Sequence, residues 1–409
     1  TPALYTQVNS SAASDVYKRQ VLVLTDDRVG PVMAGSALRS WELSRVLLAA
    51  GHEVVLGAAA GSSHPEGHGP PVVVRPPWRW AQVVVSPPWC LPARSFLGGR
   101  TLIVDGATPL LAELAASTST RAVLRRRKTA AARLPLVEAR ADAVLVAGDL
   151  QARWWSDRFQ RRPEVPVIHV PFGIPEADPP PETGRIEGVP EDWAVVLWWG
   201  GVWPWLDLDT LLAARARMGR VRASVVVPTA ARPGGASASL SAPDLLDAAH
   251  RHGLSPPAVV PLESWIPYAE RHRILNRSAV VGVLHHPGPE AELSFRTRAL
   301  DGVWAGVPVL LTEGGAVAQI AQTEGWGAVV PPGHVEATAA AIELLLGKRT
   351  QTRCRSTLES QRDGWRWSVV ARPLVEALPN LPSAPRRSLA PAALKSASVL
   401  AGAAPEERR

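Results

Sequence analysis

The residues best suited to chemistry lie in one segment of the second half of the chain, residues 290–315. The segment holds two candidate acids, Glu292 and Asp301, together with Ser294, Arg296, Arg298, Gly314 and Gly315. A carboxylate can accept two hydrogen bonds at once, which suits the hydroxyl groups of a sugar. Arginines suit a diphosphate, and so do the free N–H groups of a helix that begins after a glycine turn. The alternative, a structural helix with solvated charges, explains this convergence less well.

A second group of candidates lies near the start of the chain. Gly30 and Gly35 belong to a loop between an expected strand and an expected helix, where glycine lets a ligand approach the backbone closely. The spacing differs from G-x-G-x-x-G, so a NAD site is poorly supported, and a tight turn without a ligand is the alternative. Arg39 lies one turn into the helix and either reaches the ligand site or lies on the surface.

Histidine and tryptophan offer weaker signals. His285 and His286 are adjacent on an expected strand and therefore point to opposite faces, which is poor geometry for binding one metal ion. The pattern HExxH is absent, and we predict no metal ion and interpret one histidine as a hydrogen-bond donor to a ligand or as a loop residue. The sequence has 16 tryptophans, and four cluster at residues 198–205. Tryptophan stacks on sugar faces, but we expect at least half of them to be packing residues.

The elements that position these residues alternate between strands and helices. The 409 residues fit two α/β domains of about 150–200 residues each. Apolar runs predict strands at 21–24, 53–56, 72–74, 82–85, 101–104, 143–146 and 167–170, and again at 194–197, 223–227, 259–260, 280–284, 307–311 and 329–332. Helices are expected at 36–50, 110–116, 207–217, 298–305, 316–322 and 335–346. This duplication predicts two Rossmann-like, doubly wound parallel-sheet domains that face a central cleft, with ligands beyond the carboxyl ends of the strands.

Several of these segments resemble GT-B glycosyltransferases of family 4. The most specific stretch is residues 294–308 (SFRTRALDGVWAGVP), which is similar to the donor-site region of that family. That region is marked by an acid, seven residues and a second acid. Further similar stretches are 29–52, 141–155, 170–175, 196–205, 265–271 and 365–378. The resemblance covers nearly all of residues 21–378 and implies a GT-B fold.

The resemblance also implies roles for individual acids. Asp301 matches the second acid, which implies contacts to the nucleotide ribose, and Glu292 is the best match to the first, which implies contacts to the donor sugar. This sequence departs from the family pattern in two ways: the second acid, Asp301, is Asp rather than Glu, and eight residues instead of seven separate it from Glu292, which leaves Leu293 in strict register. The match of Glu292 to the first acid is therefore weaker than that of Asp301 to the second. Asp105 follows a strand of the first domain and either positions or deprotonates an acceptor or caps the next helix.

A third departure concerns the diphosphate. Many relatives carry an Arg and a Lys after the first strand of the second domain, whereas residues 200–205 here contain no cation. We therefore expect Arg296 and Arg298 to supply the positive charge.

Composition changes along the chain suggest domain boundaries. Residues 11–20 resemble a translated sequencing adaptor, so we exclude residues 1–20 from the fold. The expected units are an N-terminal domain (21–175), a linker rich in Pro, Glu and Gly (176–188), a C-terminal domain (189–350), a further region (351–378) and a disordered tail (379–409). The family resemblance implies that the N-terminal domain is the acceptor side and that the C-terminal domain binds the nucleotide-sugar. It also implies that residues 351–378 form a closing helix region that returns to the first domain.

The charge and the cysteine count limit location and partners. The net charge of +7 reflects either a simple excess of arginine or attraction to phosphates and to an anionic membrane surface. We find no nucleic-acid-binding motif and predict no nucleic-acid partner. Two cysteines exclude a disulfide framework and favour a reducing compartment. No membrane-spanning or signal segment is expected, so we predict a cytoplasmic protein that can contact the inner face of the membrane peripherally.

These features predict an enzyme that moves a sugar from a nucleotide-diphosphate donor to a hydroxyl of a glycan or lipid-linked acceptor. The nucleotide-sugar is a substrate, and no cofactor is predicted. The family resemblance implies retention of anomeric configuration and a role in cell-surface polysaccharide or glycolipid synthesis. Two alternatives remain open: a GT-B nucleotide-sugar epimerase, and a non-catalytic sugar-nucleotide-binding partner of a polysaccharide assembly complex.

Overall fold

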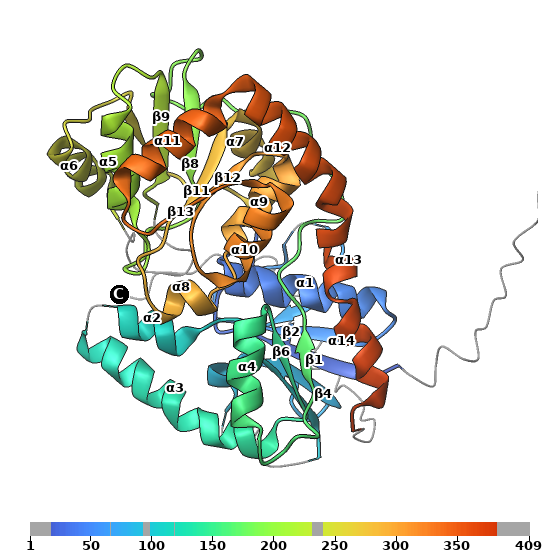
Figure 1. Cartoon of the computed structure of the whole chain (residues 1–409). Coiled ribbons are helices and arrows are strands. Elements are labelled where there is room, and N and C mark those ends of the chain that lie inside the picture. The colour runs from blue at the N-terminus through green and yellow to red at the C-terminus, as the bar shows by residue number, and fades with distance from the viewer. Residues whose placement is uncertain (1–17, 66, 93–98, 118, 231–239, 383–409) are drawn as a thin grey trace, which may run out of the picture.

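Two parallel sheets form the framework of the molecule, one in each half of the chain (Figure 1). The computed structural model describes residues 18–65, 67–92, 99–117, 119–230 and 240–382. Within these ranges the first sheet has seven strands in the order β3-β2-β1-β4-β5-β6-β7, and the second has six in the order β10-β9-β8-β11-β12-β13. The strand pairings given by the described residues are parallel in both sheets. The predicted pair of doubly wound α/β domains is confirmed.

The strands correspond to the valine- and leucine-rich runs of the sequence. The N-terminal sheet contains β1 (Gln20–Leu24), β2 (Glu53–Gly57), β3 (Val72–Val73), β4 (Val83–Ser86), β5 (Thr101–Asp105), β6 (Ala143–Val146) and β7 (Val167–His169). The C-terminal sheet contains β8 (Ala194–Trp198), β9 (Ala223–Pro228), β10 (Val259–Leu262), β11 (Val280–Val283), β12 (Val309–Thr312) and β13 (Gly327–Val330). Helices cover both faces of a parallel sheet, so its strands are apolar throughout rather than alternating.

The helices follow capping and glycine signals. In the N-terminal domain they are α1 (Gly35–Ala49), α2 (Leu110–Ala116), α3 (Arg121–Arg140) and α4 (Asp149–Arg158). The C-terminal half adds α5 (Leu208–Arg217), α6 (Ala242–Arg251), α7 (His272–Arg277), α8 (Pro289–Leu293), α9 (Thr297–Ala305), α10 (Gly315–Glu324), α11 (Val335–Leu346), α12 (Lys348–Gln361), α13 (Trp367–Val370) and α14 (Arg372–Ala377). For example, the Asp207 carboxylate accepts from the Thr210 N–H at 3.0 Å and caps α5. Gly306, with φ of 68°, ends α9. No helix in the described part of the chain is both long and apolar enough to cross a bilayer.

The ends of the described chain lie together on the N-terminal domain. Gln20 is the first residue of β1, and the Arg19 guanidinium donates to the Leu381 carbonyl at 2.9 Å. The fold thus includes residues 19 and 20, which the sequence analysis excluded, and residues 379–382 of the expected tail. The rest of that tail and residues 231–239 lie outside the described residues.

The C-terminal helices return to the first domain, as the resemblance implies. Residues 365–367 of the returning chain pair with Ile174 of the first domain. The Ile174 N–H donates to the Trp365 carbonyl at 2.8 Å, and the Ile174 carbonyl accepts from the Trp367 N–H at 3.0 Å. Helices α13 and α14 then pack against α1 and β7. The second domain is therefore connected to the first at two points, the linker and this return.

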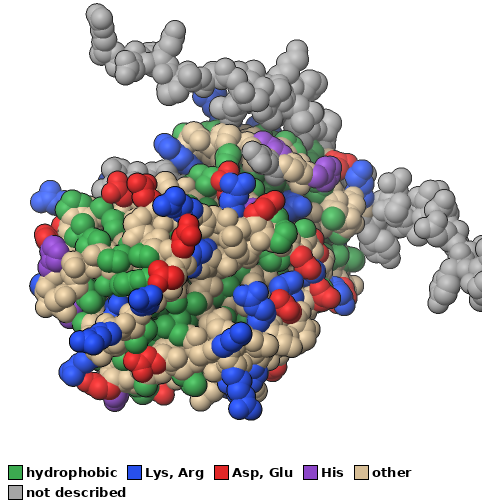
Figure 2. All heavy atoms as spheres, turned by 90° about the horizontal axis from the view of Figure 1, so that it is seen from above, with side chains coloured by type: hydrophobic (Ala, Val, Ile, Leu, Met, Phe, Trp, Pro, Cys, Tyr) green, Lys and Arg blue, Asp and Glu red, His purple; other side chains and the backbone are tan. Residues whose placement is uncertain are grey.

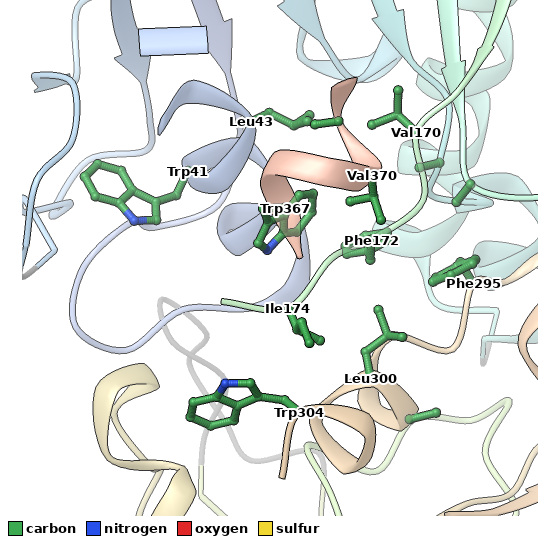
Figure 3. Close-up of a cluster of buried hydrophobic side chains, with 14 of the residues drawn as sticks. Trp41, Leu43, Val170, Phe172, Ile174, Phe295, Leu300, Trp304, Trp367 and Val370 are labelled. Carbon is green, nitrogen blue, oxygen red and sulfur yellow. The ribbon is translucent and has the colours of Figure 1, made fainter. Parts of the chain in front are cut away.

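An apolar joint connects the domains beside this crossing (Figure 3). The Phe172 ring stacks on Phe295 of the C-terminal domain at 6.0 Å between centroids and meets Trp367 at 6.1 Å. All three side chains are buried and belong to one hydrophobic cluster that spans both domains. Burial of three aromatic side chains supplies a large apolar contribution, which fixes how the two sheets face each other.

A buried ion pair supports the joint from the N-terminal side. Arg39 Nε donates to both carboxylate oxygens of Asp105 at 3.0 and 2.8 Å. Its other nitrogens donate to the carbonyls of Val170 and Pro171, and its guanidinium carbon lies 4.8 Å from the centre of the Phe172 ring. The two side chains are 2% and 8% exposed. The pair therefore positions the segment that carries Phe172.

We predict that Arg39→Met destabilises the fold by about 3–5 kcal/mol, because it leaves the Asp105 carboxylate buried without a partner. Chemical denaturation of the purified variant measures the loss. The double variant Arg39→Met/Asp105→Leu should be less destabilised than the single one, since no buried charge remains. Arg222→Met, which breaks an exposed pair with Asp192, is the control and should change little. An equal loss of stability in Arg39→Met and in the double variant would show that the unpaired charge of Asp105 does not cause the loss.

Candidate functional site

A cavity of about 620 Å³ lies between the two domains. Its N-terminal wall includes Asp26 and Asp27, which follow β1, and its C-terminal wall includes Asp301 on α9. Residues after β8 and β11 also line it, at the carboxyl ends of the central strands of the second sheet. Ligands of open α/β sheets bind at this position. The cavity is therefore the candidate functional site.

Asp301 lines the cavity as the sequence predicts, and protein donors hold its carboxylate. Arg271 Nε donates to Oδ1 at 2.8 Å and Trp199 Nε1 donates to Oδ2 at 2.7 Å. The guanidinium carbon of Arg271 lies 3.6 Å from the centre of the Tyr268 ring and 4.1 Å from the centre of the Trp304 ring. Each carboxylate oxygen can accept a further hydrogen bond. The acid is thus oriented before any ligand arrives.

Arg296 lines the cavity and also ties its loops together. The side chain is 3% exposed, and its guanidinium donates to the carbonyls of Ala291 (3.2 Å), Glu313 (3.1 Å) and Thr312. Its Nε is buried and has no hydrogen-bond partner among the described residues. Burial lowers the pKa of Arg296 to about 10, so the guanidinium stays protonated at neutral pH.

Arg298 lies where the missing cations were expected. A Cβ at Gly200 would lie 3.0 Å from Arg298 Nε, so the glycine leaves room for the guanidinium beside the 200–205 loop. Its Nη1 is buried and lacks a hydrogen-bond partner within the described ranges. Burial lowers the pKa of Arg298 to about 10, and the side chain remains a cation at neutral pH. Both predicted arginines therefore line the cavity, and each keeps one buried nitrogen without a partner among the described residues.

The acid beside these arginines is Glu290, which the sequence analysis did not single out. His285 Nδ1 lies 2.8 Å from Glu290 Oε2, and the two side chains are 5% and 6% exposed. Burial raises the pKa of Glu290 to about 7 against the opposing effect of Arg296. Burial, with the charges of Arg296 and Arg298, holds the pKa of His285 well below its usual range. A neutral histidine thus faces a carboxyl group poised to titrate near neutral pH.

The predicted sugar acid, Glu292, lies elsewhere. It is exposed and borders a small hollow beside α4 and α10 rather than the cavity. Residues 289–293 form a short helix, α8, whose turn directs positions 290 and 292 to different sides. The sequence shows two acids, Glu290 and Glu292, but it does not indicate which of them faces the cavity. The register of α8 determines this. Glu290 replaces Glu292 as the candidate.

The glycine turns are placed less favourably than expected. Gly314 and Gly315 have φ of 92° and 72° and begin α10, as a glycine turn should. However, a Cβ at Gly315 would lie 2.8 Å from the Ala291 carbonyl, so α8 covers this helix start, and neither glycine lines the cavity. Gly30 packs close to Ser63 instead of the site. The expected anion contact at these three glycines is not supported by their positions.

Two other helix starts face the cavity. Gly35 begins α1 and Thr297 begins α9, and both line the site. A Cβ at Gly35 would lie 3.8 Å from Thr297 Oγ1, so the two starts oppose each other across the domains. Free N–H groups and the helix dipole favour an anion at such ends. Ser294, also predicted, lines the cavity between Glu290 and α9.

Aromatic side chains form part of the C-terminal wall. Trp199, Trp203 and Trp205 line the cavity, and the last two rings stack at 6.0 Å between centroids. Trp198, in contrast, is fully buried in the core of the C-terminal domain. The cluster at 198–205 therefore serves both packing and the site.

Asp105 and Arg39, the remaining candidates, hold each other. Neither is among the residues that line the cavity, because each provides the partner that the buried charge of the other requires. Pro109, and not Asp105, occupies the N-cap of α2. Their positions favour a structural role in the joint over acceptor chemistry.

Comparison with known proteins supports the fold. No protein-family model and no curated protein sequence matches the chain. Among solved structures, it is similar to a sucrose-phosphate synthase from Thermosynechococcus elongatus (14% identity, 88% of this chain, 98% of that chain, TM-score 0.64). It is also similar to HepE from Anabaena in complex with UDP-glucose (16%, 89%, 100%, 0.62) and to WaaG, a glycosyltransferase involved in lipopolysaccharide biosynthesis (15%, 88%, 99%, 0.62).

These neighbours are GT-B glycosyltransferases, and the chain has the same fold: two parallel-sheet α/β domains on either side of a cleft. The likeness extends over both domains, since each neighbour is covered almost completely. At these identities it establishes the fold alone. Membership of family 4 stays a prediction.

We predict that Glu290→Gln changes how stability depends on pH. Between pH 4.5 and about 7, the Glu290 carboxyl group of the wild type holds a proton in the folded state but has lost it in the unfolded state. The contribution of Glu290 to stability therefore falls as the pH rises through that window. The variant lacks this loss. The free energy of unfolding of Glu290→Gln, relative to that of the wild type, should therefore be more favourable at pH 8 than at pH 5. Denaturation of both proteins at both pH values measures this difference. Parallel pH profiles would show that Glu290 titrates normally.

Proposed function

We propose that this protein transfers a sugar from a nucleotide-diphosphate donor, bound mainly by the C-terminal domain, to a hydroxyl group of an acceptor bound on the N-terminal side of the cavity. The observation that carries the proposal is the pair of arginines, Arg296 and Arg298, which line the interdomain cavity. Each keeps one buried nitrogen, Arg296 Nε and Arg298 Nη1, without a hydrogen-bond partner among the described residues. An unsatisfied buried donor costs about 1–3 kcal/mol, and more when it is charged. A bound diphosphate would supply the acceptors and the opposite charge.

The same arrangement suits the chemistry of transfer. Cleavage of the bond between the sugar and the diphosphate leaves negative charge on the diphosphate. Arg296, Arg298 and the start of α9 are fixed in place by the fold, so they need little rearrangement to stabilise that charge. The sugar itself develops oxocarbenium character, as in glycoside hydrolysis. The main tasks of the site are then to hold the leaving group and to exclude water.

In this proposal, one acid of the cavity binds the ribose and another faces the donor sugar. Asp301, held by Arg271 and Trp199, keeps acceptor capacity for ribose hydroxyls. Glu290, beside the arginines, takes the place proposed from sequence for Glu292 and faces the donor sugar. His285 keeps the Glu290 carboxyl group oriented. Trp199 and the stacked pair Trp203–Trp205 offer flat surfaces for a sugar or a base.

The neighbours support the class of donor. One of them, HepE, is described with UDP-glucose and, in a second structure, with UDP and glucose. We propose a nucleotide-sugar donor here on the basis of the same fold and of the two arginines, Arg296 and Arg298, that line the cavity. Retention of configuration, membership of family 4, a metal-free reaction and a role in cell-surface polysaccharide or glycolipid synthesis are part of the proposal and rest on the sequence resemblance.

The first experiment identifies the donor base. Thermal unfolding is followed with saturating UDP, GDP, dTDP or ADP, since a ligand that binds the folded state raises the apparent melting temperature. One nucleotide should raise it clearly above the others. The matching nucleotide-sugars are then incubated with and without glycan and lipid-linked acceptors. Release of nucleotide that requires an acceptor indicates transfer, conversion of the donor without acceptor indicates an epimerase, and no shift with any nucleotide contradicts the proposal.

We predict that Arg298→Ala weakens binding of the selected nucleotide by roughly 10–100-fold, because a charge-assisted hydrogen bond contributes about 1.5–3 kcal/mol. Isothermal titration calorimetry measures the change. Arg298→Lys should retain part of the affinity through its charge. Arg251→Ala, on the exposed end of α6, is the control and should bind as the wild type does. Unchanged affinity in Arg298→Ala would remove this residue from the diphosphate site.

A further inference from the structure

Helix α3 (Arg121–Arg140) concentrates positive charge on the N-terminal domain. It contains six arginines and one lysine but a single acid, Glu138. The acid is already used, because Arg158 Nη1 contacts it at 2.6 Å. The helix lies at the edge of the N-terminal domain, next to α2 (Figure 1). A strongly cationic element is therefore placed at the surface.

The helix has distinct inner and outer faces. Ala130, Leu134 and Val137 are buried and pack against the domain. On the opposite side, positions 121, 125 and 128 recur at spacings of four and three, and thus form one stripe of cations. All three side chains are exposed.

Apolar side chains accompany the stripe. Leu124 and Leu136 are 45% and 43% exposed, and they are two of the four large hydrophobic side chains that are exposed among the described residues. Both fall on the outer half of the helix, Leu124 beside the stripe and Leu136 about two turns beyond its last residue. The outer face therefore combines cations with leucines and carries no acid.

The outward cations have no partners among the residues that the structure describes. Within the described ranges, no hydrogen bond or ion pair of the side chain is found for Arg121, Arg125, Arg127 or Lys128. Elsewhere the surface differs: over the face in Figure 2, Lys and Arg side chains are interspersed with Asp and Glu. The charge on α3 is thus available to an external anionic surface.

The position of α3 relates this surface to the site. Ala122, Val123 and Arg126, in the first two turns, line the cavity, and Arg126 lies 3.6 Å from Asp26 across its N-terminal wall. The helix that carries the cationic stripe therefore also forms part of the N-terminal wall of the cavity.

We propose that the outer face of α3 docks the protein on an anionic lipid bilayer. Each Lys or Arg near such a surface contributes attraction to anionic headgroups, and exposed leucines among the cations can enter the interfacial region. A nucleic acid fits less well, because the face offers leucines rather than aromatic or polar side chains between its cations. If the proposed function holds, docking brings a lipid-linked acceptor to the cavity; the docking itself does not depend on that function.

The test is vesicle co-sedimentation of the full chain. Vesicles of phosphatidylcholine alone are compared with vesicles that contain about one third phosphatidylglycerol, at low and high salt. We expect binding only to the anionic vesicles, and weaker binding at high salt. The variant Arg121→Glu/Arg125→Glu/Lys128→Glu should bind at least tenfold more weakly. Leu124→Ser/Leu136→Ser should also reduce binding.

A matched control separates this face from net charge. Lys348→Glu/Arg349→Glu/Arg353→Glu makes the same charge change on exposed positions of α12 and should bind anionic vesicles nearly as the wild type does. Circular dichroism, and the nucleotide-induced thermal shift where the wild type shows one, confirm that each variant is folded. Equal loss in both triple variants, absence of vesicle binding by the wild type, or tighter binding to an RNA or DNA duplex than to vesicles would overturn the proposal. None of these outcomes bears on nucleotide binding, so docking and the proposed function can fail separately.

Discussion

The packing of Phe172 against Phe295 and Trp367 connects the two domains, and the geometry of the cavity depends on it. The three rings come from segments far apart in the sequence. They meet where residues 365–367, which follow the second sheet, return to the first domain and pair with Ile174. Arg39 and Asp105 reinforce this contact, since the guanidinium holds the backbone beside Phe172. Charges predicted for chemistry thus support the scaffold instead.

Inside the cavity, burial and charge oppose each other. Arg296 and Arg298 are buried enough to lower the pKa of both, and Glu290 is buried enough to raise its pKa. The folded chain retains these groups although burial disfavours their charged forms. Such a balance is typical of a site that a charged ligand completes. Arg296 Nε and Arg298 Nη1 are two of the buried nitrogens that have no partner among the described residues.

The two domains would serve different surroundings under the proposals above. The C-terminal wall supplies the arginines, Asp301 and the tryptophans, which suit a small anionic donor in solution. The N-terminal wall begins at the first turns of α3, whose outer face is cationic and apolar. An enzyme built this way can take one substrate from solution and the other from a surface, and the interdomain joint keeps both aligned.

The sequence by itself determined the two-domain plan, because buried parallel strands must be apolar and their crossovers must be helical. Helices such as Leu110–Ala116 and Val335–Leu346 were predicted at their observed bounds, and Asp301, Arg296 and Arg298 were placed in the site. Only the tertiary structure decided between Glu290 and Glu292, since the choice depends on the register of a five-residue helix packed against α10. It also decided that Asp105 pairs with Arg39, because the partner of a buried charge is set by contacts between distant segments, which no local pattern encodes.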